Sequence, residues 1–387
     1  MEQVIRRRVA QANNISTEPA IYTLLVDGNS LLKMCLVDKK MNEGGQQYGG
    51  VFQFLFQLQR LLLKKDFNFC YVFYDGYKSG QLRYQYYPDY KANRDKEYED
   101  SENQSDYDKA LAAYCRKVIE YHKNNKKPVK RQETDDEAFD RQRTILQQIL
   151  DELFVRQAIF DECEGDDLIA YYIKHKKDNE KIVIVSGDRD LTQLIRDDVC
   201  IYIPAFKRFI TPANSKEFLG MTYENILLKK ILCGDSSDNI KGVKGLGETT
   251  LLKLFPDMKE KKMSLGEVIE GSKHLLEERK QQKKKPLKVL ENIVSGVTEG
   301  CQGEKLYEIN QKIIDLSEPL LTKEAIDGME AMMYAPLDPE GREMSNVYSI
   351  IKENGMSEIL DEKKFGSLFG AFERLIKMEK TFFKKNI

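Results

Sequence analysis

The 387-residue chain lacks the closely spaced cysteines and histidines that build zinc sites. Its seven cysteines are scattered singly, no Cys-x-x-Cys pair occurs, and only three histidines are present. An odd set of isolated cysteines is typical of reduced thiols, whereas structural Zn²⁺ needs several thiolate or imidazole ligands at short spacing. The composition therefore predicts reduced thiols in the cytosol and argues against a zinc site.

Long apolar runs are missing as well. No stretch approaches the roughly 18 apolar residues that a membrane span needs. The longest apolar-rich stretch, Val51 to Leu63, is interrupted by three glutamines and an arginine. The first residues, Met1 to Arg8, are basic but lack the apolar centre of a secretory signal. We therefore expect a soluble, cytoplasmic protein with no membrane partner.

A strong charge of either sign is also absent. The 61 basic and 63 acidic residues leave a formal net charge of −2, although a DNA-binding protein usually has a basic surface. The two signs are segregated, however, and Lys and Arg collect in Lys126 to Arg131 and Arg279 to Lys288. A near-neutral total is thus compatible with an acidic metal site beside basic binding surfaces. The 41% hydrophobic content is ample for one or two packed domains.

Three short apolar, β-prone runs each lead into an aspartate. Ile21 to Val26 ends at Asp27, Phe69 to Tyr74 ends at Asp75, and Lys181 to Val185 is followed by Ser186-Gly187-Asp188. Helical spacing between the runs predicts an α/β fold with a mostly parallel sheet flanked by helices. Ligands of such sheets bind at the carboxyl ends of the strands. Three strands are therefore expected to place an aspartate at one edge.

More carboxylates follow at positions of the same kind. Glu164, Asp166 and Asp167 open the helical stretch that contains Leu168 to Ile173, and Asp190 lies two residues after Asp188. Asp235 and Asp238 are three apart, a spacing that can place both on one face of a helical turn. Any one of these aspartates alone is more often a turn or N-cap residue than a ligand. Their accumulation carries the functional prediction.

So many carboxylates at one edge would repel each other unless a cation lies between them. Mg²⁺ fits best, because it accepts carboxylate ligands and keeps several waters for a substrate phosphate. Two ions about 4 Å apart could activate the attacking water and stabilise the leaving oxygen of a phosphodiester. The predicted chemistry is hydrolysis of a phosphate ester.

Two further motifs complete the pattern. Tyr87 to Arg94 (YPDYKANR) follows the second acidic strand, and the glycine-rich turn Gly242 to Gly247 lies between helical stretches at Tyr223 to Cys233 and Glu248 to Phe255. With all these motifs in order, the sequence resembles the 5′-nuclease family. That family includes flap endonucleases, phage 5′-exonucleases, phage ribonuclease H and the 5′-nuclease domain of bacterial DNA polymerases. The resemblance covers roughly residues 21–255 and is greatest to the phage and bacterial branch.

The resemblance implies a PIN-like core and a role for each motif residue. The ligands of a first metal would be Asp27, Asp75, Glu164 and Asp166. Those associated with a second would be Asp188, Asp190, Asp235 and Asp238. Asp167 would act through water, Lys91 and Arg94 would contact the scissile phosphate, and Tyr90 would stack on a base. Further DNA contacts would come from Arg83 and from a helix-hairpin-helix with Lys241, Gly242, Lys244, Gly245 and Gly247.

The same resemblance divides the chain. Residues 1–20 form an extension without an interpretation, and residues 21–200 form the nuclease core, with a helical arch inserted at about 95–142. The insert is polar and long for a connection within a domain, so a mobile surface loop is an equal alternative. Residues 201–300 would be the helix-hairpin-helix DNA-binding lobe, and residues 301–387 a helical region without a motif.

The predicted function is a structure-specific 5′–3′ exonuclease or flap endonuclease with two Mg²⁺ ions, for which Mn²⁺ could substitute, and with K⁺ at the helix-hairpin-helix. Its partner would be branched or 5′-ended duplex DNA, and its setting a bacterial or phage-infected cell. A primer-removing ribonuclease acting on RNA–DNA hybrid and a catalytically silent branched-DNA-binding protein are the alternatives. A phosphatase with an aspartyl nucleophile is rejected, because Asp27-Gly28-Asn29 lacks the required second aspartate. A monomer is the default expectation.

Overall fold

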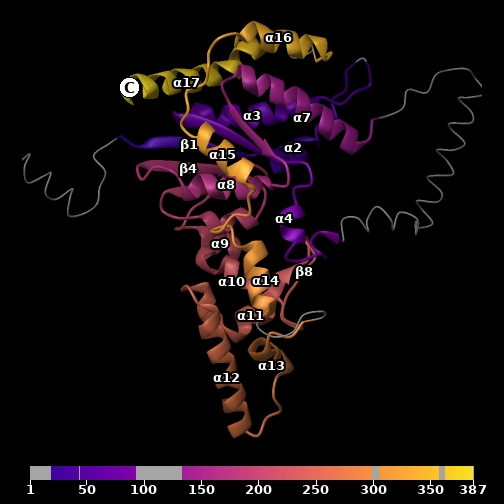
Figure 1. Ribbon diagram of the computed structural model, residues 1–387, viewed down its shortest axis with the longest axis vertical. Coiled ribbons are helices and arrows are strands. Elements are labelled where there is room, and N and C mark those ends of the chain that lie inside the picture. The colour runs from indigo at the N-terminus through magenta and orange to yellow at the C-terminus, as the bar shows by residue number, and fades with distance from the viewer. Residues whose placement is uncertain (1–18, 43, 93–132, 299–304, 357–361, 387) are drawn as a thin grey trace, which may run out of the picture.

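The computed structural model describes residues 19–42, 44–92, 133–298, 305–356 and 362–386 (Figure 1). A six-stranded sheet lies at one end of the elongated molecule, and a helical lobe extends from it to the other end. The strand order is β3-β2-β1-β4-β5-β6. All neighbours are parallel except β6, which is antiparallel to β5. The α/β fold with a mostly parallel sheet, predicted from the sequence, is therefore confirmed.

The six strands are short. Their bounds are β1 Ile21–Asp27, β2 Phe69–Asp75, β3 Arg156–Phe160, β4 Glu180–Val185, β5 Val199–Ile203 and β6 Arg208–Ile210. The chain adds strands outward from β1 first through β2 and β3, then through β4, β5 and β6 on the other side. The strand order thus reverses at β1. In open α/β sheets the ligand crevice lies at the carboxyl end of such a reversal point, which here is Asp27.

Helices cover both faces of the sheet because its strands are apolar on both sides. Leu24 and Val26 of β1 face one apolar core, and Leu25 faces the other. The first core is covered by α2 Gly28–Cys35, α3 Gly49–Lys64, α7 Asp135–Glu152, α16 Met344–Glu353 and α17 Glu362–Asn386. The second is covered by α8 Gly165–Lys174 and α15 Lys323–Met332, and by the end of α17. Figure 1 shows α3, α7, α16 and α17 on one side of the strands and α8 with α15 on the other.

The lobe has an apolar core of its own, in which Leu232, Val243, Leu251 and Leu290 are buried. Its elements are η3 Tyr223–Asn225, α10 Ile226–Cys233, β7 Gly234–Asp235, β8 Ile240–Lys241, α11 Glu248–Leu254, η4 Pro256–Lys259, α12 Leu265–Gln281, α13 Lys288–Ser295 and α14 Lys305–Ile314. The short helices α4 Gln81–Tyr84 and α9 Ser215–Leu219 lie between lobe and sheet (Figure 1), and η2 Asp190–Leu194 contacts α10 of the lobe and β5 of the sheet. No helix in the described ranges is long and apolar enough to cross a membrane.

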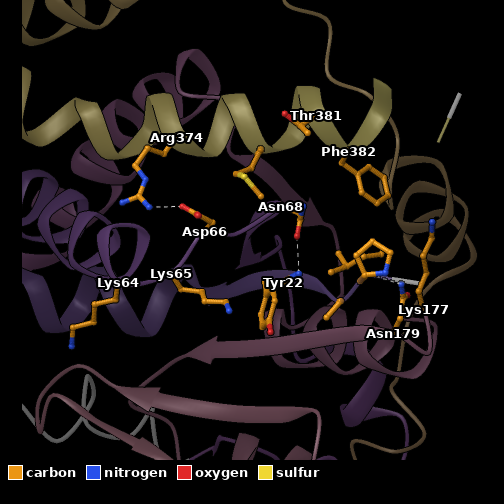
Figure 2. Close-up of a pocket in the computed structure, with 14 residues that line it drawn as sticks. Tyr22, Lys64, Lys65, Asp66, Asn68, Lys177, Asn179, Arg374, Thr381 and Phe382 are labelled. Atoms are coloured by element: carbon orange, nitrogen blue, oxygen red, sulfur yellow. Dashed lines mark hydrogen bonds and ion pairs between the residues drawn. The ribbon is translucent and has the colours of Figure 1, made fainter. Parts of the chain in front are cut away.

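The last helix returns to the sheet and closes its amino end. There α17, β1 and the segment between α3 and β2 enclose a pocket of about 640 Å³, shown in Figure 2. Arg374 of α17 forms an ion pair with Asp66, and the backbone N–H of Tyr22 donates to Asn68 Oδ1 at 2.9 Å. Contacts between α17 and both α3 and β2 place the end of the chain on the core, at the edge opposite the aspartates.

A buried ion pair joins α17 to the edge strand β3. Arg156 Nη1 lies 2.8 Å from Glu379 Oε2, and the two side chains are 2% and 5% exposed. The guanidinium also lies over the rings of Phe69 and Tyr71, 5.0 and 5.4 Å from their centroids. Loss of one partner would leave the other charge buried without compensation.

We predict that Glu379→Ala lowers the free energy of unfolding by about 3 kcal/mol, because the Arg156 charge loses its partner. The double variant Arg156→Met/Glu379→Leu should be less destabilised than Glu379→Ala, since it leaves no buried charge. Urea unfolding followed by circular dichroism measures both. A Glu379→Ala protein as stable as the parent would contradict a structural role for the pair.

Candidate metal centre

The ends of β1 and β2 bring the first two aspartates to the edge of the sheet. Asp27 caps helix α2 by accepting from the backbone N–H of Ser30 at 2.9 Å, and it accepts from Ser186 Oγ at 2.7 Å. Asp75 ends β2 and accepts from the side-chain amide of Asn29 at 2.7 Å. The capping role predicted as the alternative for a lone aspartate is therefore real for Asp27. It does not exclude a ligand role, because a carboxylate has several lone pairs.

Helix α8 begins at the same edge. Glu164 is its N-cap residue, and the backbone N–H of Gly165 donates to Asp75 Oδ1 at 2.8 Å, which ties the helix start to the end of β2. A Cβ on Gly76 would lie 1.8 Å from the carbonyl oxygen of Phe160, so only glycine permits this approach of β2 and β3. The close packing brings Glu164 and Asp166 next to Asp75.

The turn after β4 contributes the next pair. Ser186 Oγ accepts from the backbone N–H of Asp188 at 2.9 Å, and Asp188 Oδ1 accepts from that of Asp190 at 2.8 Å. Because Ser186 also donates to Asp27, one hydroxyl connects the β1 and β4 ends. Ser186 was not singled out from the sequence, where Ser186-Gly187 is indistinguishable from ordinary turn chemistry.

The lobe supplies Asp235 and Asp238, but not from a helical turn as the spacing predicts. Asp235 ends β7, and Asp238 lies in the turn that leads to β8. The tight hairpin nevertheless brings them together. Carboxylate oxygens of Asp190, Asp235 and Asp238 all lie within 4.8 Å of one another, a grouping that could hold a metal ion. The prediction of a shared helical face is wrong, while the predicted proximity is observed.

Lys230, which sequence reasoning missed, lies among these acids. It projects from α10, is 7% exposed, and forms ion pairs with Asp190 and, at 2.5 Å, with Asp235 Oδ2. Burial alone would lower its pKa, but the two carboxylates raise the pKa above the ordinary value. In the sequence Lys230 is one of two adjacent lysines in an apolar helix, so only its burial distinguishes it.

The acids of the sheet and of the lobe line one small cavity of about 100 Å³. Its lining includes members of both predicted metal groups: Glu164, Asp166, Asp188, Asp190 and Asp238. A wider cavity of about 560 Å³ opens beside it and is lined by Ser30, Asp188, Asp190, Lys230 and Asp235. Six of the eight predicted ligands thus line the two cavities, and the charges of the other two, Asp27 and Asp75, act on Asp166.

Burial and mutual repulsion raise the pKa values of two carboxylates at this edge, Asp27 and Asp166. The pKa of Asp27 is raised to about 7, mainly by burial and also by the charges of Asp75 and Asp188, although hydrogen bonds from Ser30 and Ser186 lower it in part. The pKa of Asp166 lies well above its ordinary value, first because of burial and then because of Asp27 and Asp188. An edge of this kind binds protons or cations strongly.

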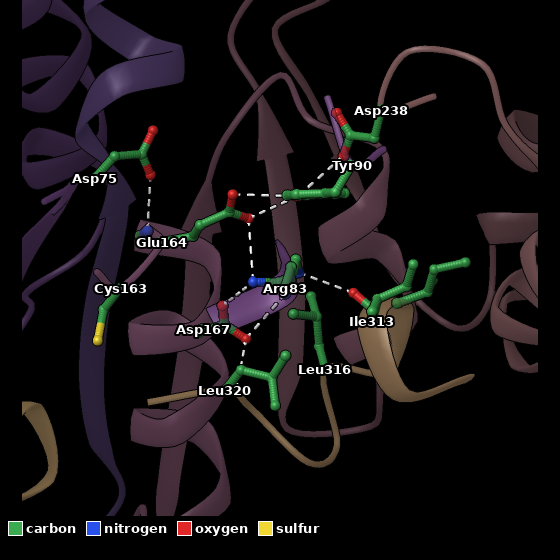
Figure 3. A network of polar contacts seen from close by, with 12 residues as sticks. Asp75, Arg83, Tyr90, Cys163, Glu164, Asp167, Asp238, Ile313, Leu316 and Leu320 are labelled. Atoms are coloured by element: carbon green, nitrogen blue, oxygen red, sulfur yellow. Dashed lines mark hydrogen bonds and ion pairs between the residues drawn. The ribbon is translucent and has the colours of Figure 1, made fainter. Parts of the chain in front are cut away.

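Arg83, Tyr90 and Asp167 form a buried network behind the acids (Figure 3). Arg83 is 5% exposed and binds Asp167 through two nitrogens at 2.5 and 3.1 Å, while its Nε donates to the Ile313 carbonyl at 2.9 Å. Tyr90 is 2% exposed, and its hydroxyl donates to Glu164 at 3.0 Å. Asp167 also accepts from the backbone N–H of Leu320 at 3.0 Å.

These contacts bear on three assignments made from the sequence. Arg83 is 5% exposed, and its guanidinium is paired with Asp167 and Glu164 rather than presented on the surface to a DNA phosphate. The ring of Tyr90 is covered and cannot stack on a base in this arrangement. Asp167 is 1% exposed and forms an ion pair with Arg83 at 2.5 Å, and its predicted action through water stays a prediction. Arg83 and Tyr90 contact Glu164 directly, Arg83 at 3.2 Å, and Asp167 holds Arg83.

Lys91 lies at the mouth of the small cavity. Its Nζ is 2.5 Å from Glu164 Oε1, and its backbone N–H donates to the Asp238 carbonyl at 2.9 Å. Burial raises the pKa of Glu164, but Arg83 and Lys91 more than offset this and hold it below its usual range. Arg94 and most of the predicted arch lie outside the described residues.

The glycine-rich turn, residues 242–247, follows the β7–β8 hairpin, and at its start the backbone packs closely against the end of α10. A Cβ on Gly242 would lie 2.1 Å from the carbonyl carbon of Cys233, and Gly234 has φ +73°. In this turn Gly245 (φ +81°) and Gly247 are exposed, and so are Lys241 and Lys244. The backbone N–H of Lys244 donates to the Val297 carbonyl at 2.9 Å, so this group holds the hairpin to the end of α13.

The fold and the carboxylate edge agree with a match to a known protein family. The family model described as "5′-3′ exonuclease, N-terminal resolvase-like domain" matches residues 22–220, more than half of the chain. The chain belongs to this family. The family resemblance predicted from the sequence is therefore confirmed.

Curated relatives include DNA polymerase I of Bacillus subtilis, 37% identical over 161 residues, which are 39% of this chain and 18% of that protein. The thermostable DNA polymerase I of Thermus thermophilus is 28% identical over 243 residues, covering 62% of this chain and 24% of that one. The chain thus spans about a quarter or less of the length of these two relatives.

Solved structures with the same fold include the phage T5 5′-exonuclease with bound zinc, at TM-score 0.54 and 19% identity, covering 86% of this chain and 98% of that one. The T5 D15 flap endonuclease in complex with DNA and metal ions gives TM-score 0.53 and 20% identity, with 87% and 99% coverage. At these identities the likeness establishes the fold.

We predict that the metal-free protein becomes less stable as pH rises. The folded pKa of Asp27, about 7, exceeds the ordinary 3.8, so its contribution is complete below about pH 4 and is lost as pH rises through about 7. Asp27→Asn keeps a capping oxygen and should raise the melting temperature in EDTA at pH 8 by a few degrees, and by less at pH 5.

Thermal melts at pH 5 and pH 8, in EDTA and in Mg²⁺, measure this effect. Mg²⁺ should stabilise the parent protein more at pH 8, where the carboxylates are ionised and bind the cation. An equal Mg²⁺ shift at both pH values would contradict a carboxylate site at this edge.

Proposed function

We propose that this chain is a structure-specific 5′ nuclease that hydrolyses DNA phosphodiesters at 5′ ends or flaps with two Mg²⁺ ions. The observation that carries the proposal is the meeting of carboxylates from β1, β2, α8, the β4 turn and the lobe hairpin at one edge of the sheet. Membership of the 5′-3′ exonuclease family supports the same chemistry. A bacterial or phage-infected cytoplasm and a monomer belong to the proposal.

The residues present fit hard divalent cations. All candidate ligands are oxygens, as Mg²⁺ prefers, and the grouping of Asp190, Asp235 and Asp238 satisfies the spacing of a metal site. Asn29 Oδ1, next to Asp75, is buried without a hydrogen-bond partner among the described residues. The first cation would be held by Asp27, Asp75, Glu164 and Asp166, and the second by Asp188, Asp190, Asp235 and Asp238. When bound, the ions supply Lewis acidity and an ionised water.

The chain's own groups would position the substrate around this centre. The Lys91 ammonium, held at 2.5 Å from Glu164, would bind the scissile phosphate and offset its developing charge. Arg94 would join it. Lys241, Lys244 and the exposed glycines Gly245 and Gly247 would contact a duplex phosphate, with K⁺ as a further ligand there. Mn²⁺ would replace Mg²⁺, because the ligand set is all oxygen.

Two alternatives are distinguished by substrate and by cutting. A primer-removing ribonuclease would prefer an RNA–DNA hybrid, and a silent binder would hold branched DNA without cleaving it. The complete set of carboxylates disfavours the silent binder. Cleavage of a 5′-labelled DNA flap duplex, with RNA-flap and blunt controls, in Mg²⁺ and in EDTA, tests all three. Binding without cutting in Mg²⁺ and Mn²⁺ would overturn the nuclease proposal.

We predict that Asp188→Asn lowers flap cleavage at least 100-fold and changes affinity for flap DNA less than threefold, on the order expected when an essential electrostatic group is lost. Asp178→Asn is the matched control, since it removes an exposed charge at the amino end of β4. Single-turnover cleavage and fluorescence anisotropy measure the two effects. An Asp188→Asn protein that cuts normally would refute the ligand assignment.

A further inference from the structure

The loop that joins α12 to α13 carries three consecutive lysines in a defined turn. The backbone N–H of Lys284 donates to the Arg279 carbonyl at 2.8 Å, and that of Lys283 donates to the Lys280 carbonyl at 3.0 Å. This pair of bonds is a Schellman motif. Arg279 Nε closes the loop from the side by donating to the Lys285 carbonyl at 3.0 Å. We call residues Lys283, Lys284 and Lys285 the lysine tip.

The backbone of Lys283 is in the left-handed region, with φ +53°. Glycine is the usual residue at this position of a Schellman motif, because a Cβ there is strained. The Lys283 side chain is exposed and so contributes no packing that would offset the strain. The strain at Lys283 is therefore not offset by packing, as is also the case at the exposed residues Lys78 and Lys207.

The tip lysines also differ from their neighbours in charge pairing. Lys273, Lys280 and Lys288 each have a glutamate three residues away, at 2.7, 3.8 and 3.3 Å. In the described part of the chain no carboxylate lies within ion-pair distance of the tip ammonium groups. The tip lysines also line an open cavity of about 600 Å³ against α12, and the two glutamates of that lining, Glu277 and Glu291, pair with Lys280 and Lys288. The tip therefore concentrates positive charge that the protein does not neutralise.

The position of the tip relates it to the metal centre. Figure 1 shows α12 extending from the level of α11 to the end of the molecule farthest from the sheet. Along the long axis the carboxylate edge comes first, the hairpin second and the tip last (Figure 1). Helix α10 contacts β7, η2 and α11. The side-chain amide of Asn292 in α13 donates to the Lys244 carbonyl at 2.9 Å. The 17 residues of α12 span about 25 Å, or about seven base pairs of duplex.

We propose that the lysine tip binds the sugar–phosphate backbone of the duplex arm beyond the hairpin, and so lengthens the duplex that the protein recognises. This rests on the proposed function for the identity of the nucleic acid. The contact would be independent of sequence, since exposed lysine ammonium groups meet phosphates rather than base edges. It would also depend on salt, because each neutralised phosphate releases counterions.

Affinity for flap substrates whose duplex arm grows from about 8 to about 24 base pairs tests the proposal, in EDTA so that no cleavage occurs. The parent should gain affinity once the arm extends about seven base pairs past the hairpin. Lys283→Gln/Lys284→Gln/Lys285→Gln should lose that gain, on the order of tenfold, and its salt slope should fall by about 2 to 3. On the shortest arm it should bind like the parent.

The matched control is Lys64→Gln/Lys65→Gln/Lys181→Gln, which removes the same charge at the amino end of the sheet. It should keep the gain with arm length. A tip variant that binds every arm as the parent does would overturn the proposal, and so would a control that loses as much as the tip variant.

Lys283→Gly separates binding from folding. Glycine relieves the left-handed strain, so the melting temperature should stay equal or rise while affinity for the long arm falls. An unchanged long-arm affinity would count against the tip. The binding test and the cleavage test can fail independently. A parent protein that does not cut in Mg²⁺ but binds longer arms more tightly would refute the nuclease activity and still support the duplex contact.

Discussion

The repulsion among buried carboxylates at the carboxyl edge is the constraint on which the rest of the structure depends. Asp27 and Asp166 both have raised pKa values there, so the edge is unfavourable when fully ionised without cations. The protein places three cationic side chains against it, from α4, from the segment after α4 and from α10: Arg83, Lys91 and Lys230. The side chains of Arg83 and Lys230 are 6% and 9% exposed and that of Lys91 is 19% exposed, so their partners distinguish them more than their burial does.

Arg83 is sealed inside and belongs to the scaffold. It joins α4 to α8 through Asp167 and reaches the end of α14 through the Ile313 carbonyl, while Leu320 donates to the same Asp167. Lys91 lines the small cavity and Lys230 the wider one, and both contact candidate ligands, as Arg83 does at Glu164. A cation that enters the edge would therefore compete with these ammonium groups, whereas Arg83 would stay in place.

The sequence predicts best where one physical signal dominates. Apolar β-branched and aromatic runs buried on both faces predict β1, β2 and β4, and an aspartate after each predicts the edge. Strand β3 escapes the same reasoning, because Arg156 and Gln157 interrupt it and their partners come from distant segments. The roles of Lys230 and Ser186 depend on tertiary contacts across 40 and 159 residues, which no local pattern contains.

Burial also explains why Tyr90 and Arg83 do not present themselves to DNA as the sequence predicts. Tyr90 and Arg83 lie in or near a motif that resembles a DNA-contacting segment, and an exposed aromatic or cation there would contact DNA. In the fold the same motif is drawn onto the lobe by bonds from Asn239 to the Asp89 carbonyl and from Tyr87 to the Asn239 carbonyl. The motif thus fixes the lobe against the metal edge, where Tyr90 and Lys91 both line the small cavity.

Charge segregation explains how a chain of net charge −2 could bind DNA, the substrate proposed above. The acidic edge is confined to the carboxyl ends of the strands, and the exposed lysines of the hairpin and the lysine tip lie progressively farther along the lobe. Solvent-exposed charges are screened beyond about 8 Å at physiological salt, so the acids do not cancel lysines two helical turns or more away. The net charge therefore does not predict what this protein binds, because the local electrostatic potential at each surface determines binding there.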